Sequence, residues 1–171
     1  MRRLLSVVVC FLMVLTASCI PMDVRAEDGY PTRVIHVVYD DSGSMIRTGG
    51  NPVDTWCQAK YSMEVFAAML GAQDTMNIYV MSDYVQGTTA EPRLRLNGGD
   101  GASANVSKVH DMLTSAGETP FNAVRKAYAD LAEASADEKW LVVLTDGEFQ
   151  DAENMDDFFD GKQQDVKVRF L

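Results

Sequence analysis

The stretch Val34-Ile35-His36-Val37-Val38-Tyr39-Asp40-Asp41-Ser42-Gly43-Ser44 decides both the expected fold and the candidate site. Its first six residues form a largely apolar run, which is typical of a buried parallel strand. The polar residues Asp40, Ser42 and Ser44 follow directly. Because open α/β sheets bind ligands at the carboxyl ends of their strands, the sequence places a candidate site in this loop.

A second apolar run, Trp140-Leu141-Val142-Val143-Leu144, ends at Thr145-Asp146-Gly147, and Gly117-Glu118-Thr119-Pro120 lies between the two runs. If the two strands are neighbours, the loops after them flank one crevice. Two carboxylates and three hydroxyls then converge, from Asp40, Asp146, Ser42, Ser44 and Thr119. An all-oxygen set of this kind suits a hard divalent cation, Mg²⁺ first and Mn²⁺ or Ca²⁺ next.

Strand and helix patterns alternate along residues 33–171. The patterns predict strands at Arg33–Tyr39, Thr75–Met81, Arg93–Leu96, Lys139–Thr145 and Val166–Leu171. They predict helices at Thr55–Leu70, Ser103–Leu113, Pro120–Ala134 and Asp151–Phe159. This alternation predicts a doubly wound α/β fold, with a mostly parallel central sheet and helices on both faces.

Length and charge narrow the possible functions. A chain of 171 residues fits one domain. The formal net charge of -10 disfavours nucleic acid as a partner, because phosphate binding needs a basic face. Outside the export segment described next, Cys57 is the only cysteine, so an internal disulfide is excluded; we expect a buried, inert thiol.

Residues 1–26 have the pattern of an export segment of bacterial type, with a short basic start and an apolar core. Three outcomes stay open. Cleavage after Ala26 would give a secreted protein, lipidation of Cys19 would give a lipoprotein, and an uncleaved Leu4–Ile20 would be a short membrane anchor. All three export the domain and confine membrane contact to this segment or to a region after Leu171. Residues 27–32 are a polar lead-in to the domain at 33–171.

Hydroxyl ligands leave most of a cation's charge uncompensated. A cation held by Ser42, Ser44 and Thr119 would therefore stay electrophilic at an open coordination position, which an acidic side chain of a partner protein can fill. No general base stands out beside it, so we expect no enzymatic activity.

The order Asp40-x-Ser42-x-Ser44, then Thr119, then Asp146 in Thr-Asp-Gly resembles the metal-ion-dependent adhesion site of von Willebrand factor type A domains. The resemblance covers Arg33 to Leu171. It implies that the two serines and Thr119 contact the metal, directly or through water, and that the two aspartates act largely through water. It further implies an extracytoplasmic, metal-dependent protein-binding or adhesion module. Since that family continues with a further strand and a closing helix, it also implies a domain truncated after Leu171.

Two other functions compete with this one. A Mg²⁺-dependent phosphohydrolase of the haloacid-dehalogenase type would use Asp40 as nucleophile, but that family expects an aspartate where this chain has Ser42. A metal-free scaffold would use the same segments only as turns and helix caps. Of the remaining polar residues, we expect His36 in the core and Asp41 on a solvated rim.

Overall fold

The computed structural model describes residues 29–48, 50–87, 91–112, 117–147, 149, 158–159 and 165–171. The export segment and most of the expected helix Asp151–Phe159 lie outside these residues, so both stay predictions. In the part of the chain that is described, no helix has the length and apolar character needed to cross a bilayer.

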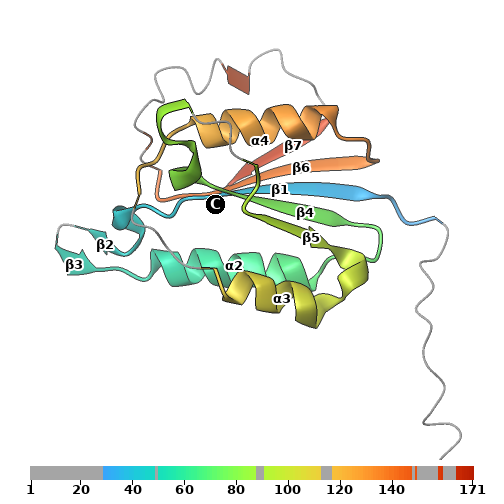
Figure 1. The fold of residues 1–171 in the computed structure, drawn as a ribbon, viewed down its shortest axis with the longest axis horizontal. Helices are drawn as coiled ribbons and strands as arrows, with labels where there is room; N and C mark the ends of the chain where they lie inside the picture. Colours follow the sequence, from blue (N-terminus) through green and yellow to red (C-terminus); the bar gives the residue numbers. More distant parts are fainter. Residues whose placement is uncertain are drawn as a thin grey trace, which may run out of the picture.

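A five-stranded sheet forms the centre of the molecule, in the order β5-β4-β1-β6-β7 (Figure 1). β1 pairs in parallel with both β4 and β6, and β6 pairs in parallel with β7. β4 and β5 are antiparallel. The strands are β1 (Arg33–Tyr39), β4 (Thr75–Val80), β5 (Leu94–Asn97), β6 (Glu138–Leu144) and β7 (Val166–Phe170).

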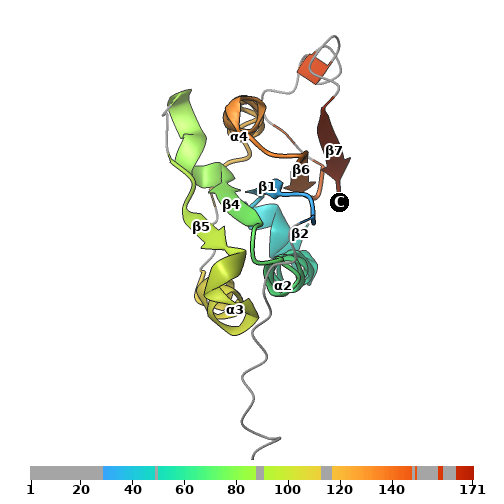
Figure 2. The same cartoon turned by 90° about the vertical axis from the view of Figure 1, so that its right-hand side faces the viewer.

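Helices cover both faces of this sheet (Figure 2). α2 (Thr55–Ala68) and α3 (Ala102–His110) lie on one face, and α4 (Asn122–Glu133) lies on the other. Short 3-10 turns are η1 (Gly43–Met45), η2 (Met81–Gly87) and η3 (Gly98–Asp100). A small hairpin, β2 (Arg47–Thr48) with β3 (Asn51–Pro52), follows η1.

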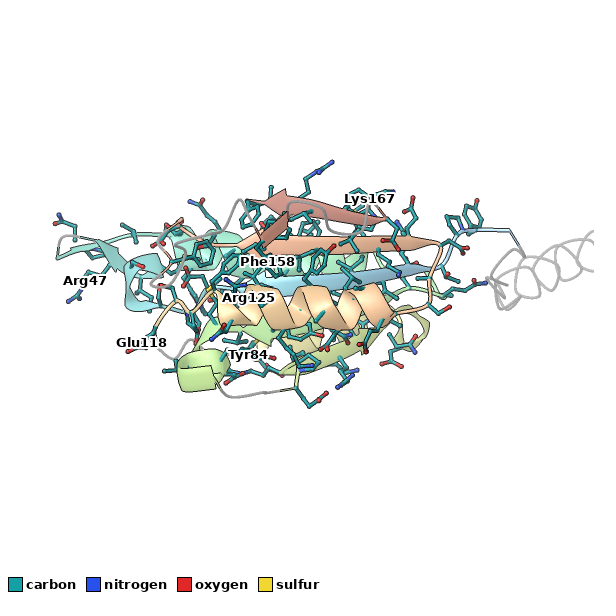
Figure 3. The ribbon with its side chains drawn as sticks, turned by 90° about the horizontal axis from the view of Figure 1, so that it is seen from above. Arg47, Tyr84, Glu118, Arg125, Phe158 and Lys167 are labelled. Carbon is teal, nitrogen blue, oxygen red and sulfur yellow. The ribbon has the colours of Figure 1, made fainter. Side chains whose placement is uncertain are left out.

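The core has two halves because side chains alternate across each strand. Val37 and Tyr39 of β1 pack toward α2 and α3, whereas Val38 packs toward α4. The half under α4 is aromatic and includes Phe121, whose ring meets Phe158 edge-to-face at 5.5 Å between centroids. Figure 3 shows Arg125 and Phe158 close together beside α4; the Arg125 Cζ atom lies 5.0 Å from the Phe158 ring centroid.

The predicted fold class is wrong as it was stated. The sheet is mixed, and the described residues contain three α-helices. This arrangement differs from the doubly wound von Willebrand factor type A sheet that the sequence predicted. The physical reason lies between β4 and β5. A parallel crossover usually needs a helix that packs across the sheet; η2 is a short turn instead, and β5 runs back along β4.

Two single-residue expectations have opposite outcomes. His36 is a core residue, as predicted, with 2% of its surface exposed. Cys57 is exposed rather than buried, so that prediction is wrong. It lies in the first turn of α2, where the buried face is carried by Ala59, Met63 and Ala67 instead.

Candidate functional site

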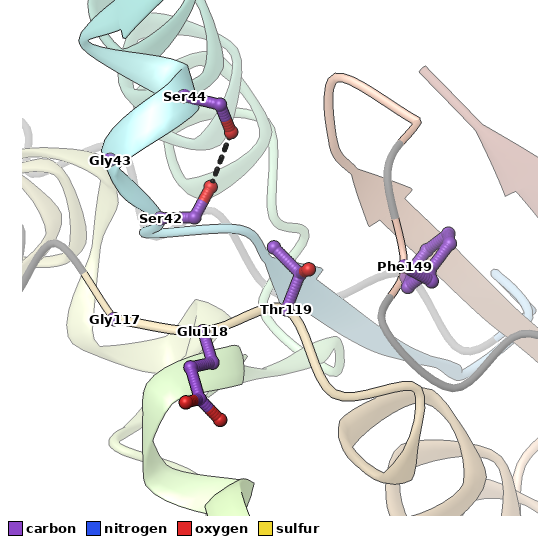
Figure 4. Close-up of a pocket in the computed structure, with 7 residues that line it drawn as sticks. All are labelled: Ser42, Gly43, Ser44, Gly117, Glu118, Thr119 and Phe149. Carbon is purple, nitrogen blue, oxygen red and sulfur yellow. Dashed lines mark hydrogen bonds between the residues drawn. The ribbon is translucent and has the colours of Figure 1, made fainter.

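A polar pocket of about 330 Å³ opens at the carboxyl end of β1 (Figure 4). Its two sides come from segments far apart in the sequence, and a parallel bridge between Ser42 and Gly117 joins them. The residues that line the pocket are Ser42, Gly43, Ser44, Gly117, Glu118, Thr119 and Phe149. The pocket therefore brings together three of the five predicted site residues, namely Ser42, Ser44 and Thr119.

The η1 turn sets the two serines side by side. Their hydroxyl oxygens lie 2.8 Å apart, and the buried Met45 fixes the turn in the core under α2. Thr119 comes from the opposite wall and rises toward the serines, whereas the Glu118 side chain points away from them (Figure 4). Ser42 and Thr119 are both buried, and both line the same pocket.

Asp40 lies behind the serines and is completely buried. Its carboxylate accepts hydrogen bonds from the Ser42 backbone N–H at 2.9 Å and from the Thr145 hydroxyl at 2.9 Å. Burial raises the pKa of Asp40, while donation from Ser42 and Thr145 acts against the rise. All of these donors are neutral. Thr145 orients Asp40, a role that the sequence did not reveal because it depends on β1 and β6 being neighbours.

Asp41 is also completely buried, so its predicted place on a solvated rim is wrong. Its two carboxylate oxygens accept hydrogen bonds from the backbone N–H of Ser82 at 3.0 Å and from the Ser82 hydroxyl at 2.7 Å. These bonds hold the start of η2 against the loop after β1. Asp41 thus supports the wall behind the pocket, and only the pairing of β1 with β4 reveals this.

Asp146 is exposed in the turn after β6 and is not among the residues that line the pocket. Gly147 follows with φ of 97°, a backbone conformation that favours glycine. Its N–H donates to the Thr145 hydroxyl at 3.1 Å, which closes the turn. The structure therefore places Asp146 at the same end of the sheet as the pocket but outside its lining.

One pair of hydroxyl oxygens, which share a hydrogen bond in this structure, has a spacing that an octahedral Mg²⁺ site also requires. Mg²⁺–oxygen distances of about 2.0–2.1 Å place adjacent ligands of an octahedron about 2.8–3.0 Å apart. The hydroxyls of Ser42 and Ser44, 2.8 Å apart, already have this spacing. In the described part of the chain no group of three or more His, Cys, Asp or Glu side chains could hold a metal, so a cation here would depend on hydroxyl ligands.

Comparisons with known proteins give matches only among solved structures. No family model matches this chain, and no curated protein does either. Among solved structures it resembles the PilB minor pilin from Streptococcus sanguinis, with 20% identity and a TM-score of 0.48 over 70% of this chain and 31% of that chain. A single-site mutant of that pilin gives 22% identity and a TM-score of 0.46 over 69% of this chain and 30% of that one. The chain thus spans less than a third of these solved chains.

These comparisons overturn the family prediction. No family model supports a von Willebrand factor type A domain, and the solved structures are of a minor pilin. The prediction of a metal-dependent adhesion module is wrong with it, whereas the cation site, which was argued from the oxygen atoms of the residues themselves, stays a prediction. The physical reason is that Asp-x-Ser-x-Ser, Thr-Pro and Thr-Asp-Gly are also ordinary turns and caps, which any α/β sheet needs at its strand ends.

Proposed function

We propose that this protein is an exported domain that binds a divalent cation, Mg²⁺ or Mn²⁺, in the pocket at the carboxyl end of β1. One observation carries the proposal. Asp40 is a fully buried carboxylate whose hydrogen bonds all come from neutral donors, and the hydroxyls of Ser42 and Ser44 lie in front of it.

The energetics favour a positive charge at this position. A buried carboxylate is costly unless a cation or a metal compensates its charge. Asp40 takes part in none of the ion pairs formed among the described residues. A divalent cation on the hydroxyls would supply the missing charge, and Asp40 would strengthen Ser42 as a ligand by accepting its hydrogen bonds.

The roles of the residues follow from their positions. Ser42, Ser44 and Thr119 would contact the cation, while Asp40 and Asp146 would act through bound water, which Mg²⁺ gives up reluctantly. A carboxylate of another molecule is the ligand class that suits a position left open by neutral hydroxyls. The net charge of -10 disfavours nucleic acid.

A binding role fits the pocket better than a catalytic one. Among the described residues that line the pocket, Glu118 is the one carboxylate, and it points away from the serines (Figure 4). A general base must lie within hydrogen-bond reach of the group it deprotonates. Attachment to the cell or release from it depends on residues 1–26, and export in any of the three forms predicted above is part of this proposal.

Calorimetric titration of the full chain with MgCl₂ and with MnCl₂ tests the cation site. The double variant Ser42→Ala, Ser44→Ala should lose at least tenfold in affinity, since it removes two ligands. The matched control is Ser103→Ala with Ser107→Ala, two exposed serines of α3. Unchanged thermal denaturation in chelator would show that each variant folds. A pocket variant that binds within twofold of the unmodified chain would refute the site.

A further inference from the structure

His36 joins β1 to α4 through a buried polar contact. Its ring Nδ1 lies 2.8 Å from the carbonyl oxygen of Ala127 on α4. Because a carbonyl oxygen can only accept, Nδ1 carries the proton and donates it. The ring Nε2 lies 3.0 Å from the Asn77 side-chain nitrogen on β4 and accepts a hydrogen bond from it. Both ring nitrogens are therefore satisfied in the neutral form of the imidazole.

Protonation of the ring would break this arrangement. Nε2 would become a donor facing the Asn77 amide nitrogen, which is also a donor, so the amide would have to turn over. The added charge would lie at a position that is 2% exposed. Burial lowers the pKa of His36, and it outweighs the opposing effects of the Ala127 carbonyl and of Asp130.

The charged and titratable groups around His36 come from four elements. Tyr79 of β4 packs against the imidazole with ring centroids 5.0 Å apart, and its hydroxyl donates to Asp130 at 2.9 Å. Asp130 is itself paired with Lys126 one helical turn earlier on α4. The charged groups that act on the imidazole are Lys126 and Asp130 of α4 and Arg95 of β5. Tyr84 of η2 packs on Tyr79 and not on the imidazole itself. Asp130 is the one carboxylate of this set, and the ammonium of Lys126 already compensates its negative charge.

We propose that His36 is a pH-sensitive latch, which holds α4 on the sheet when the imidazole is neutral and lets α4 loosen when the medium becomes acidic. The two faces are built differently. α2 and α3 pack on each other on one face, whereas α4 packs on the sheet and η2 and meets the rings of Phe158 and Phe159 through Tyr128 on the other. α4 begins three residues after Thr119, so its loosening would reach the wall of the pocket.

The direction of the effect follows from linkage. A histidine in an opened segment binds a proton near pH 6.5, its ordinary pKa, whereas His36 in the closed latch binds one only at lower pH. The closed form is therefore fully favoured above about pH 6.5, and it loses stability as the pH falls toward the lower pKa of the folded state. At about pH 5.5, one unit below the ordinary value, the open form gains up to about tenfold.

Amide hydrogen exchange of the full chain at about pH 7.5 and pH 5.5, corrected for intrinsic rates, tests the latch. We expect α4 amides to lose up to about tenfold in protection at the lower pH while α2 and α3 amides keep theirs. The chain has two histidines, so His110→Gln is a matched control: its side chain is 71% exposed, and the variant should behave as the unmodified chain does. His36→Gln should remove the pH dependence of α4.

A second variant covers the case in which His36→Gln does not fold. Asn77→Asp would place a carboxylate at Nε2 and favour the imidazolium, so α4 should keep or gain protection at about pH 5.5. Equal loss of protection in α4, α2 and α3 would overturn the proposal, because it would reflect unfolding of the whole domain. A loss of α4 protection at the lower pH that survives in His36→Gln, or in Asn77→Asp, would overturn it as well.

Discussion

The two ends of the sheet each hold a buried aspartate, but only one has a cation beside it. At the amino end of β1, the Asp74 carboxylate accepts hydrogen bonds from the Arg33 guanidinium and from the Gly71 N–H. At the carboxyl end, Asp40 has neutral donors. The amino end is closed and compensated in charge, whereas the carboxyl end opens into the pocket. This difference is what the proposed cation site requires: the charge of Asp74 is compensated within the fold, whereas that of Asp40 is left for a bound cation.

Glycine substitutions should give the largest difference in the free energy of unfolding between the two ends of the sheet. A Cβ added at Gly98, at the amino end, would lie 1.7 Å from the Gly71 carbonyl oxygen, so backbone must move. We expect Gly98→Ala to lower the free energy of unfolding by about 3 kcal/mol or more. At the pocket, a Cβ on Gly43 meets nothing within 4 Å, and Gly43→Ala should stay within about 0.5 kcal/mol. Urea denaturation measures both; similar losses would contradict the contrast.

The next largest effect should come from the cation. At a Mg²⁺ concentration of 100 times the dissociation constant, binding should stabilise the fold by about 2.7 kcal/mol. Asp40→Asn should lose most of this gain, because it removes the charge behind the hydroxyls and keeps the shape. Thermal denaturation with Mg²⁺ and with chelator gives the comparison. Equal stabilisation of the variant and the unmodified chain would show that Asp40 plays no part in cation binding.

Replacing the buried aspartate by asparagine should change the free energy of unfolding differently at the two ends when chelator is present. Asp74→Asn weakens charge-assisted hydrogen bonds to the partly exposed Arg33 and should cost about 1–2 kcal/mol. Asp40→Asn removes a buried charge that has no cationic partner, and the free energy of unfolding should stay equal or rise. Asp100→Asn, in a largely exposed pair with Lys108, is the control and should cost less than about 0.5 kcal/mol. Equal losses at Asp74 and Asp40 would remove the contrast between the ends.

The sequence predicted local structure better than it predicted relations between strands. The apolar runs of β1 and β6 and the position of His36 in the core could be read directly, because apolar patterns report burial. The antiparallel β5 could not, since Leu94–Asn97 has the same pattern in either direction. At the site, the serines and Thr119 were found by their spacing. Thr145 and Ser82 were missed, because they act on Asp40 and Asp41 across strand pairs that no local pattern encodes.

The smallest effect concerns a clamp at the amino end, where Asp137 accepts hydrogen bonds from the Thr32 backbone N–H at 2.8 Å and from its hydroxyl at 2.9 Å. These bonds lower the pKa of Asp137 below its ordinary value, the backbone donor contributing most. A depressed folded-state pKa stabilises the fold above the unfolded-state pKa of about 3.9, and this contribution is lost as the pH falls through the folded-state pKa. The difference in stability between the unmodified chain and Asp137→Asn should therefore shrink from about pH 5 downward.

Thr32→Val separates the two donors of this clamp, because it removes the hydroxyl and keeps the backbone N–H. In thermal denaturation between about pH 5 and pH 3, this variant should show a pH dependence between those of the unmodified chain and Asp137→Asn. A difference between the unmodified chain and Asp137→Asn that stays constant over this range would mean that Asp137 acts through the shape of the turn before β6. The charge of Asp137 would then not stabilise the amino end of the sheet. The ion pair of Asp74 with Arg33 would be the main electrostatic interaction there.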